Sequence, residues 1–132
     1  METNFNAFFI DLDGTTIDIP EEQNTENLGI SEQNLYALQQ ISKKKPIIIS
    51  TGRANSEFVL NVANKIGAPY CICMNGSIIV DNKNKIIKTT PIDEKTTIKL
   101  IEYMQNRNLF YTMNEGGVIY YGNKQNCEFE RP

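Results

Sequence analysis

The sequence predicts an α/β fold with a Rossmann-like parallel sheet at its core. Two observations predict it: short apolar runs alternate with helix-like segments over residues 5–76, and each apolar run ends in a cluster of polar residues. Such alternation is typical of βαβ units with right-handed crossovers. Because open α/β sheets bind ligands at the carboxyl ends of their strands, we expect the polar clusters to meet along one edge.

The first half of the chain is expected to form strand, helix, strand, helix, strand. Residues 5–11 predict a buried strand, residues 20–30 a polar loop, and residues 32–44 a helix whose N-cap is Ser31. The unbroken apolar run at residues 47–49 is typical of a parallel strand covered on both faces.

The next segments continue this order and then change it. Apolar residues spaced i, i+3, i+4, i+7 predict a helix that ends at Gly67, and residues 70–74 predict a third strand. A hairpin over residues 77–90, a helix over residues 93–107 and a second hairpin over residues 109–121 follow, in α+β style. We therefore expect a partial core over residues 1–90 and the beginning of an inserted α+β cap over residues 91–132.

Composition narrows the possible functions. The chain has 132 residues, 40% of them hydrophobic and 22% charged, and a net charge of −3 with no basic stripe. Nucleic acid is therefore a poor partner. No apolar segment is long enough to cross a membrane, so no membrane partner is expected. The absence of histidine excludes Ser-His-Asp and Cys-His hydrolases built from this chain alone.

Cysteine usage predicts the compartment. The three cysteines are Cys71, Cys73 and Cys127, an odd number, and the N-terminus does not resemble a signal peptide. We expect a reducing, cytoplasmic protein in which Cys71 and Cys73 are free core thiols. A zinc site is improbable because the chain has no second cysteine pair and no histidine.

Asp11 and Asp13 carry the main chemical signal. They stand two residues apart at a strand end, where extended chain points both carboxylates to one face. Such carboxylates need a cation, and Mg²⁺ prefers oxygen ligands of this kind; aspartate is also a nucleophile toward phosphorus. The alternative is an Asp-x-Asp-Gly turn without function. The preceding strand, the following Thr15-Thr16 and the polar end of the next strand at Thr51 favour a site.

Residues 8–16 (FFIDLDGTT) resemble the first motif of the haloacid dehalogenase superfamily, and residues 48–53 (IISTGR) resemble its second. Met74-Asn75-Gly76 followed by a hairpin is similar to the Cof-type branch, whose members insert a large α/β cap after the third strand. The resemblance covers the whole chain, more loosely in the last forty residues.

The resemblance implies magnesium-dependent hydrolysis of small phosphate monoesters, of the sugar-phosphate type, through an aspartyl-phosphate. Asp11 is then the nucleophile and Asp13 the general acid and base. Mg²⁺ is held by the Asp11 carboxylate and the Asp13 main-chain carbonyl. The expected phosphate-binding residues are Leu12, Asp13, Gly14, Thr51 and Gly52, and the expected substrate or cap contacts are Arg53 and Asn75.

Two elements of that family have no counterpart here: a lysine that balances charge at the nucleophile, and a downstream acidic motif. The lysines at 83, 85 and 88 lie in the first hairpin and do not match. We therefore expect an inactive or weakly active fragment of a longer protein, with a strand edge left unpaired and a homodimer formed through exposed surfaces. A phosphomutase and a non-catalytic phosphate-binding remnant are the alternatives, and the resemblance implies that the cap selects the substrate.

Overall fold

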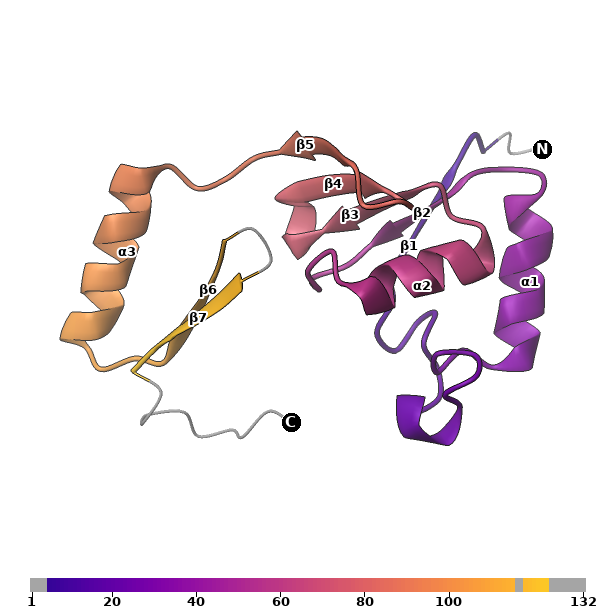
Figure 1. The fold of residues 1–132 in the computed structure, drawn as a ribbon, viewed down its shortest axis with the longest axis horizontal. Coiled ribbons are helices and arrows are strands. Elements are labelled where there is room, and N and C mark those ends of the chain that lie inside the picture. The colour runs from indigo at the N-terminus through magenta and orange to yellow at the C-terminus, as the bar shows by residue number, and fades with distance from the viewer. Residues whose placement is uncertain (1–4, 116–117, 124–132) are drawn as a thin grey trace. The chain divides into compact units, whose positions relative to one another are not determined.

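The computed structural model describes residues 5–115 and 118–123. The chain divides into two compact units, Met1–Thr90 and Pro91–Pro132. The first unit holds a five-stranded sheet and two α-helices (Figure 1). This architecture confirms the predicted α/β, Rossmann-like class.

The sheet of the first unit has the strand order β1-β2-β3-β4-β5. The first three strands pair in parallel, and β4 and β5 continue the sheet in antiparallel pairing, with a register shift between Ile79 and Val80. The carboxyl ends of β1, β2 and β3 therefore lie on one edge. The strands are β1 (Phe8–Ile10), β2 (Ile47–Ser50), β3 (Tyr70–Cys73), β4 (Ile78–Asp81) and β5 (Ile86–Thr89).

Two capped helices connect the parallel strands. The helix α1 (Glu32–Ser42) begins after Ser31, whose hydroxyl accepts a hydrogen bond from the backbone N–H of Asn34. The helix α2 (Glu57–Ile66) ends at Gly67, which adopts φ +80° and could not carry a side chain without strain. Because α1 contacts α2 and β2, and α2 contacts β3, the helices form one layer against the sheet.

The core lies between this helix layer and the sheet. Ile47 and Ile49 of β2 are fully buried, whereas Ile48 between them is only partly buried. The prediction that β2 is covered on both faces was wrong for the described part of the chain, since α1 and α2 cover one face only. The residues with no exposed surface on the strands are Ile47, Ile49, Cys71, Cys73 and Val80, and on the second helix Val59, Val62, Ala63 and Ile66.

The first strand is also more exposed than its composition predicts. Phe9 is 66% exposed and Phe8 is 36% exposed, so the prediction of a buried strand was wrong. The reason is position: β1 is an edge strand in the described sheet and pairs only with β2. An apolar sequence run does not distinguish an edge strand from a central one.

The loop between β1 and α1 is ordered by side-chain hydrogen bonds. It contains the short 3₁₀ turn η1 (Glu21–Gln23). Asp18 accepts hydrogen bonds from the backbone N–H and hydroxyl of Ser31 at 2.8 and 2.6 Å, and from Asn34 at 2.9 Å. The two hydrogen bonds from Ser31 hold the pKa of Asp18 below its ordinary value, and all three contacts tie the loop to the start of α1.

The second unit consists of α3 (Glu94–Asn106), β6 (Tyr111–Glu115) and β7 (Val118–Gly122), the strands forming an antiparallel hairpin. Asp93 is the N-cap of α3, accepting a hydrogen bond from the Thr96 N–H at 2.9 Å. None of the described residues of this unit is buried. The turn of this hairpin was expected at residues 115–117, of which 116 and 117 lie outside the described residues.

Cys71 and Cys73 are free and buried in β3. Burial raises the pKa of the Cys71 thiol to about 12 and that of Cys73 to about 11, so both are uncharged core side chains. Cys127 lies outside the described residues. Within the described ranges, no helix combines the length and the apolar character needed to cross a membrane.

Candidate active site

The loop after β1 forms a tight turn around the carbonyl group of Leu12. The carbonyl oxygen of Leu12 accepts hydrogen bonds from the backbone N–H groups of Thr15, Thr16 and Ile17, at 3.3, 3.0 and 2.8 Å. Leu12 is fully buried, so neither its side chain nor its backbone presents exposed surface to a ligand. Gly14 adopts φ +76° with open space where a Cβ would lie. Glycine is thus needed here for the backbone conformation.

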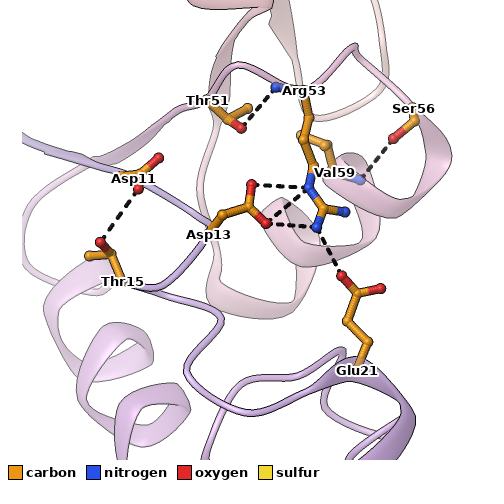
Figure 2. Close-up of polar contacts among 8 residues, drawn as sticks. All are labelled: Asp11, Asp13, Thr15, Glu21, Thr51, Arg53, Ser56 and Val59. Carbon is orange, nitrogen blue, oxygen red and sulfur yellow. Dashed lines mark hydrogen bonds and ion pairs between the residues drawn. The ribbon is translucent and has the colours of Figure 1, made fainter. Parts of the chain in front are cut away.

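Two threonines of this turn contact Asp11. The Thr16 hydroxyl donates to the Asp11 carbonyl oxygen at 2.7 Å, and Thr16 is almost fully buried. The Thr15 hydroxyl lies 3.4 Å from Asp11 Oδ2 (Figure 2). Asp11 itself is exposed, with its carboxylate accessible at the carboxyl end of β1.

Thr51, at the end of β2, offers a hydroxyl donor. It is only 4% exposed, and its backbone N–H donates to the Ile72 carbonyl oxygen at 2.9 Å. The hydroxyl oxygen accepts the backbone N–H of Arg53 at 3.1 Å, so the hydroxyl proton can be donated elsewhere (Figure 2). A donor held in this way suits an anionic ligand.

Asn75 joins the end of β3 to the same edge. Its backbone N–H donates to the Thr51 carbonyl oxygen at 3.2 Å, and the residue adopts φ +53° in the short turn η2 (Met74–Gly76). A Cβ built on Gly52 would lie 3.1 Å from Asn75 Oδ1. The Asn75 amide therefore lies directly over Gly52, in the space that a side chain at position 52 would need.

Arg53 forms the strongest charge contact of this edge. Its Nη2 lies 2.7 Å from Asp13 Oδ1, and its Nε donates to both Asp13 carboxylate oxygens at 3.2 and 3.1 Å (Figure 2). The same Nη2 lies 2.9 Å from Glu21 Oε1, and the guanidinium lies 4.7 Å from the Phe58 ring centroid. Hydrogen bonding to Asp13 raises the pKa of Arg53, and burial lowers it to a smaller extent.

The carboxyl ends of β1, β2 and β3 lie on one edge, where contacts join Asp13 to Arg53 and Thr51 to Asn75. Glu21 and Phe58 were missed. Glu21 lies in a polar loop without a recognisable motif, and Phe58 looks like an ordinary helix residue. No sequence signal marks either contact with Arg53, because both depend on tertiary structure.

Magnesium is the cation that these oxygens would suit. The Asp11 carboxylate and the Asp13 main-chain carbonyl are hard ligands, while the Asp13 carboxylate is engaged by Arg53. Within the described part of the chain, no three acidic, histidine or cysteine side chains cluster as a metal site. Mg²⁺ commonly binds through one or two carboxylates plus waters and substrate oxygens, so a site of few protein ligands fits it.

A family model for haloacid dehalogenase-like hydrolases matches residues 8–131. The phosphatase YwpJ of Bacillus subtilis (strain 168) is 27% identical over 113 residues, which are 84% of this chain and 37% of that protein. A solved haloacid dehalogenase-like hydrolase from B. subtilis is similar, with a TM-score of 0.70 and 26% identity over 88% of this chain and 39% of its own.

A further solved structure is the subclass IIB sugar phosphatase BT4131, with a TM-score of 0.67 over 89% of this chain and 44% of its own. At 22% identity this likeness shows a shared fold alone. The chain spans less than half the length of each of these proteins. The fold, the strand-end motifs and the family match agree: the chain belongs to the haloacid dehalogenase-like hydrolases.

Proposed function

We propose that the intact protein containing this chain hydrolyses small phosphate monoesters, of the sugar-phosphate type, with Asp11 as nucleophile. One observation carries the proposal: an accessible Asp11 carboxylate stands beside Asp13 and the available Thr51 hydroxyl at one edge of the parallel sheet. The phosphatase activity named for the B. subtilis relative supports it.

The proposed chemistry has two steps. An Asp11 carboxylate oxygen attacks phosphorus and the bond from phosphorus to the ester oxygen breaks. Asp13, which enters the cycle protonated, gives its proton to the leaving oxygen. Asp13 then takes a proton from water, which attacks phosphorus and releases Asp11 and inorganic phosphate. Each residue returns to its starting state, so the cycle balances.

Other groups of the edge hold the phosphoryl oxygens in this proposal. Thr51 donates its hydroxyl proton, and the backbone N–H groups of Asp13 and Gly52 donate to the remaining oxygens. The Gly14 N–H already donates to the Ile17 carbonyl oxygen at 3.1 Å, and Leu12 has no exposed surface, so these two expected phosphate contacts are not available in this conformation. Asn75 and Arg53 face the rest of the substrate or the cap. Bound Mg²⁺, held by Asp11 and Asp13, would neutralise the charge of the transferring phosphoryl group.

The proposal is tested with the intact protein. Aryl phosphate and a panel of sugar phosphates are offered with and without Mg²⁺, and phosphate release is measured. Asp11→Asn should lower kcat at least about a thousandfold, because the covalent intermediate is lost. Asp93→Asn is the matched control, because asparagine is an equally good N-cap for α3. Activity that survives Asp11→Asn contradicts the nucleophile assignment.

The same assay separates the alternatives. Transfer of phosphate between two positions of one sugar, without release to water, identifies a phosphomutase. Binding of phosphate without turnover identifies a non-catalytic remnant. Whether the isolated chain of 132 residues keeps any activity is measured beside the intact protein.

Domain role, assembly and location complete the proposal. We propose that residues 91–132 form the beginning of the cap, which the intact protein would use to select its substrate.

A homodimer through exposed apolar surface is supported by the exposure of Phe9 on the edge strand and is tested by the oligomeric state in solution. A reducing, cytoplasmic location is supported by the two free, buried thiols of β3.

A further inference from the structure

Glu21 lies outside both strand-end motifs and nevertheless contacts the site. Nη2 of Arg53 lies 2.7 Å from Asp13 Oδ1 and 2.9 Å from Glu21 Oε1, so its two protons can be divided between the two carboxylates (Figure 2). We propose that Glu21 is a positioning residue, which orients the Asp13 carboxylate by fixing the guanidinium of Arg53. This inference rests on the proposed role of Asp13 as general acid and base.

Glu21 is well placed for such a role because its own loop is braced. The turn η1 is closed by hydrogen bonds from Gln23 N–H to Pro20 and from Asn24 N–H to Glu21. Packing against Gly29 is tight: a Cβ there would lie 3.3 Å from Glu21 Cγ.

The start of this loop is fixed to the residues that follow its end as well. Asp18 accepts three hydrogen bonds from Ser31 and Asn34 at the start of α1. The loop that carries Glu21 is thus tied at both ends to the unit that holds the site.

The guanidinium is held on three sides. Asp13 accepts hydrogen bonds from Nε and Nη2, and Glu21 accepts one from Nη2. The Phe58 ring centroid lies 4.7 Å from the guanidinium carbon. These ion pairs are partly exposed, with the Arg53 side chain 36% accessible, so they add little to folding stability. These ion pairs fix the orientation of the Asp13 carboxylate, and proton transfer depends on that orientation.

The test compares kinetics of the intact protein in two backgrounds. Glu21→Ala should lower kcat about fivefold with KM nearly unchanged, because one of three restraints on Arg53 is removed. Glu21→Gln, which keeps the acceptor oxygen, should lose less. Glu22→Ala is the matched control, since Glu22 belongs to the same turn and forms no ion pair with any described residue.

The second background shows whether Glu21 acts through Arg53. In an Arg53→Ala protein, adding Glu21→Ala should change kcat by less than about twofold. Equal losses in both backgrounds would overturn the inference. So would a rise in kcat in the Glu21→Ala protein, because the contact would then restrain Asp13 rather than position it.

A readout without turnover separates this inference from the proposed function. Hydrogen exchange of the Arg53 Nη2 protons, one of which is donated to Glu21 Oε1, should become faster in Glu21→Ala and stay unchanged in Glu22→Ala when followed by NMR. If Asp11→Asn abolishes activity while Glu21→Ala matches the unaltered protein in kcat and in exchange, only the inference fails. If no activity depends on Asp11, the proposed function fails, and faster exchange still supports the contact.

Discussion

Asp13 and Arg53 lie 40 residues apart in the sequence and form a two-pronged ion pair at the edge of the sheet. Asp13 follows β1 and Arg53 follows β2, which are paired in parallel. The contact therefore depends on the register of these strands, and it connects the two motifs that the sequence shows separately.

Replacing Arg53 should affect catalysis more than folding. We expect Arg53→Ala to lower kcat/KM about tenfold, because Asp13 loses its main orienting partner. Stability should fall by about 1 kcal/mol or less, since the pair is partly exposed. Arg53→Lys should restore little, because an ammonium cannot bind both carboxylate oxygens in the same plane.

Arg107→Ala is the matched control for these variants, since Arg107 contacts the Tyr103 ring in the second unit. Thermal unfolding and steady-state kinetics of all three proteins decide the matter. The loss of activity can be expressed as a change in activation free energy. An equal or larger fall in the free energy of unfolding would show that Arg53 is chiefly a structural residue.

Local sequence signals predicted the elements well and their environment poorly. The N-cap Ser31 and the C-terminal Gly67 were both identified, because capping depends on neighbouring residues. The exposure of Phe9 was missed, because an apolar run does not reveal which strand lies at an edge. Glu21 was missed because its partner is 32 residues away and the loop carries no periodic pattern.

The hydroxyl of Thr51 gives a second prediction. Thr51→Val keeps the shape of the side chain, removes the donor and leaves the Arg53 N–H without its acceptor. We expect kcat/KM to fall about a hundredfold, as for loss of one oxyanion donor. Thr51→Ser keeps the hydroxyl and should retain activity within about threefold. A loss in Thr51→Ser as large as that in Thr51→Val would contradict the assignment of the effect to the hydroxyl alone.

Gly52 and Asn75 give a third prediction. Gly52 does not need a glycine-only backbone angle, but an added Cβ would lie 3.1 Å from Asn75 Oδ1. Gly52→Ala should therefore displace the Asn75 amide and raise KM about threefold or more, with unfolding changed by less than about 1 kcal/mol.

The control for this clash removes the amide. Asn75→Gly permits the positive φ of that residue and takes away its side chain. In an Asn75→Gly background, Gly52→Ala should have no further effect on KM. Additive effects of the two substitutions would place the cause of the Gly52→Ala defect elsewhere.

The core provides a stability prediction that is independent of activity. Ile49→Ala removes a fully buried side chain between β2 and the helix layer and should cost about 2–5 kcal/mol in the free energy of unfolding. Ile87→Ala makes the same change on β5, where the side chain is 54% exposed, and should cost about 0.5 kcal/mol or less. Denaturant unfolding of both variants measures the difference, and equal costs would contradict the assigned core.

Asp18 predicts how stability depends on pH. Hydrogen bonds from Ser31 hold the pKa of Asp18 below its ordinary value of 3.8, so the unfolded chain takes up the proton more readily than the folded chain. The stabilisation is present above the unfolded pKa and is lost as pH falls through the folded pKa.

Asp18→Asn should therefore lower the melting temperature near pH ~6, and the difference should shrink as pH falls through the lowered pKa of folded Asp18. Glu22→Gln removes one exposed carboxylate of the same loop and is the charge-matched control. Melting curves across this range measure the gap between each variant and the unaltered protein. A gap that stays constant for Asp18→Asn would mean that the loop is braced by the neutral hydrogen bonds alone, and that the charge of Asp18 contributes nothing to holding Glu21 in reach of Arg53.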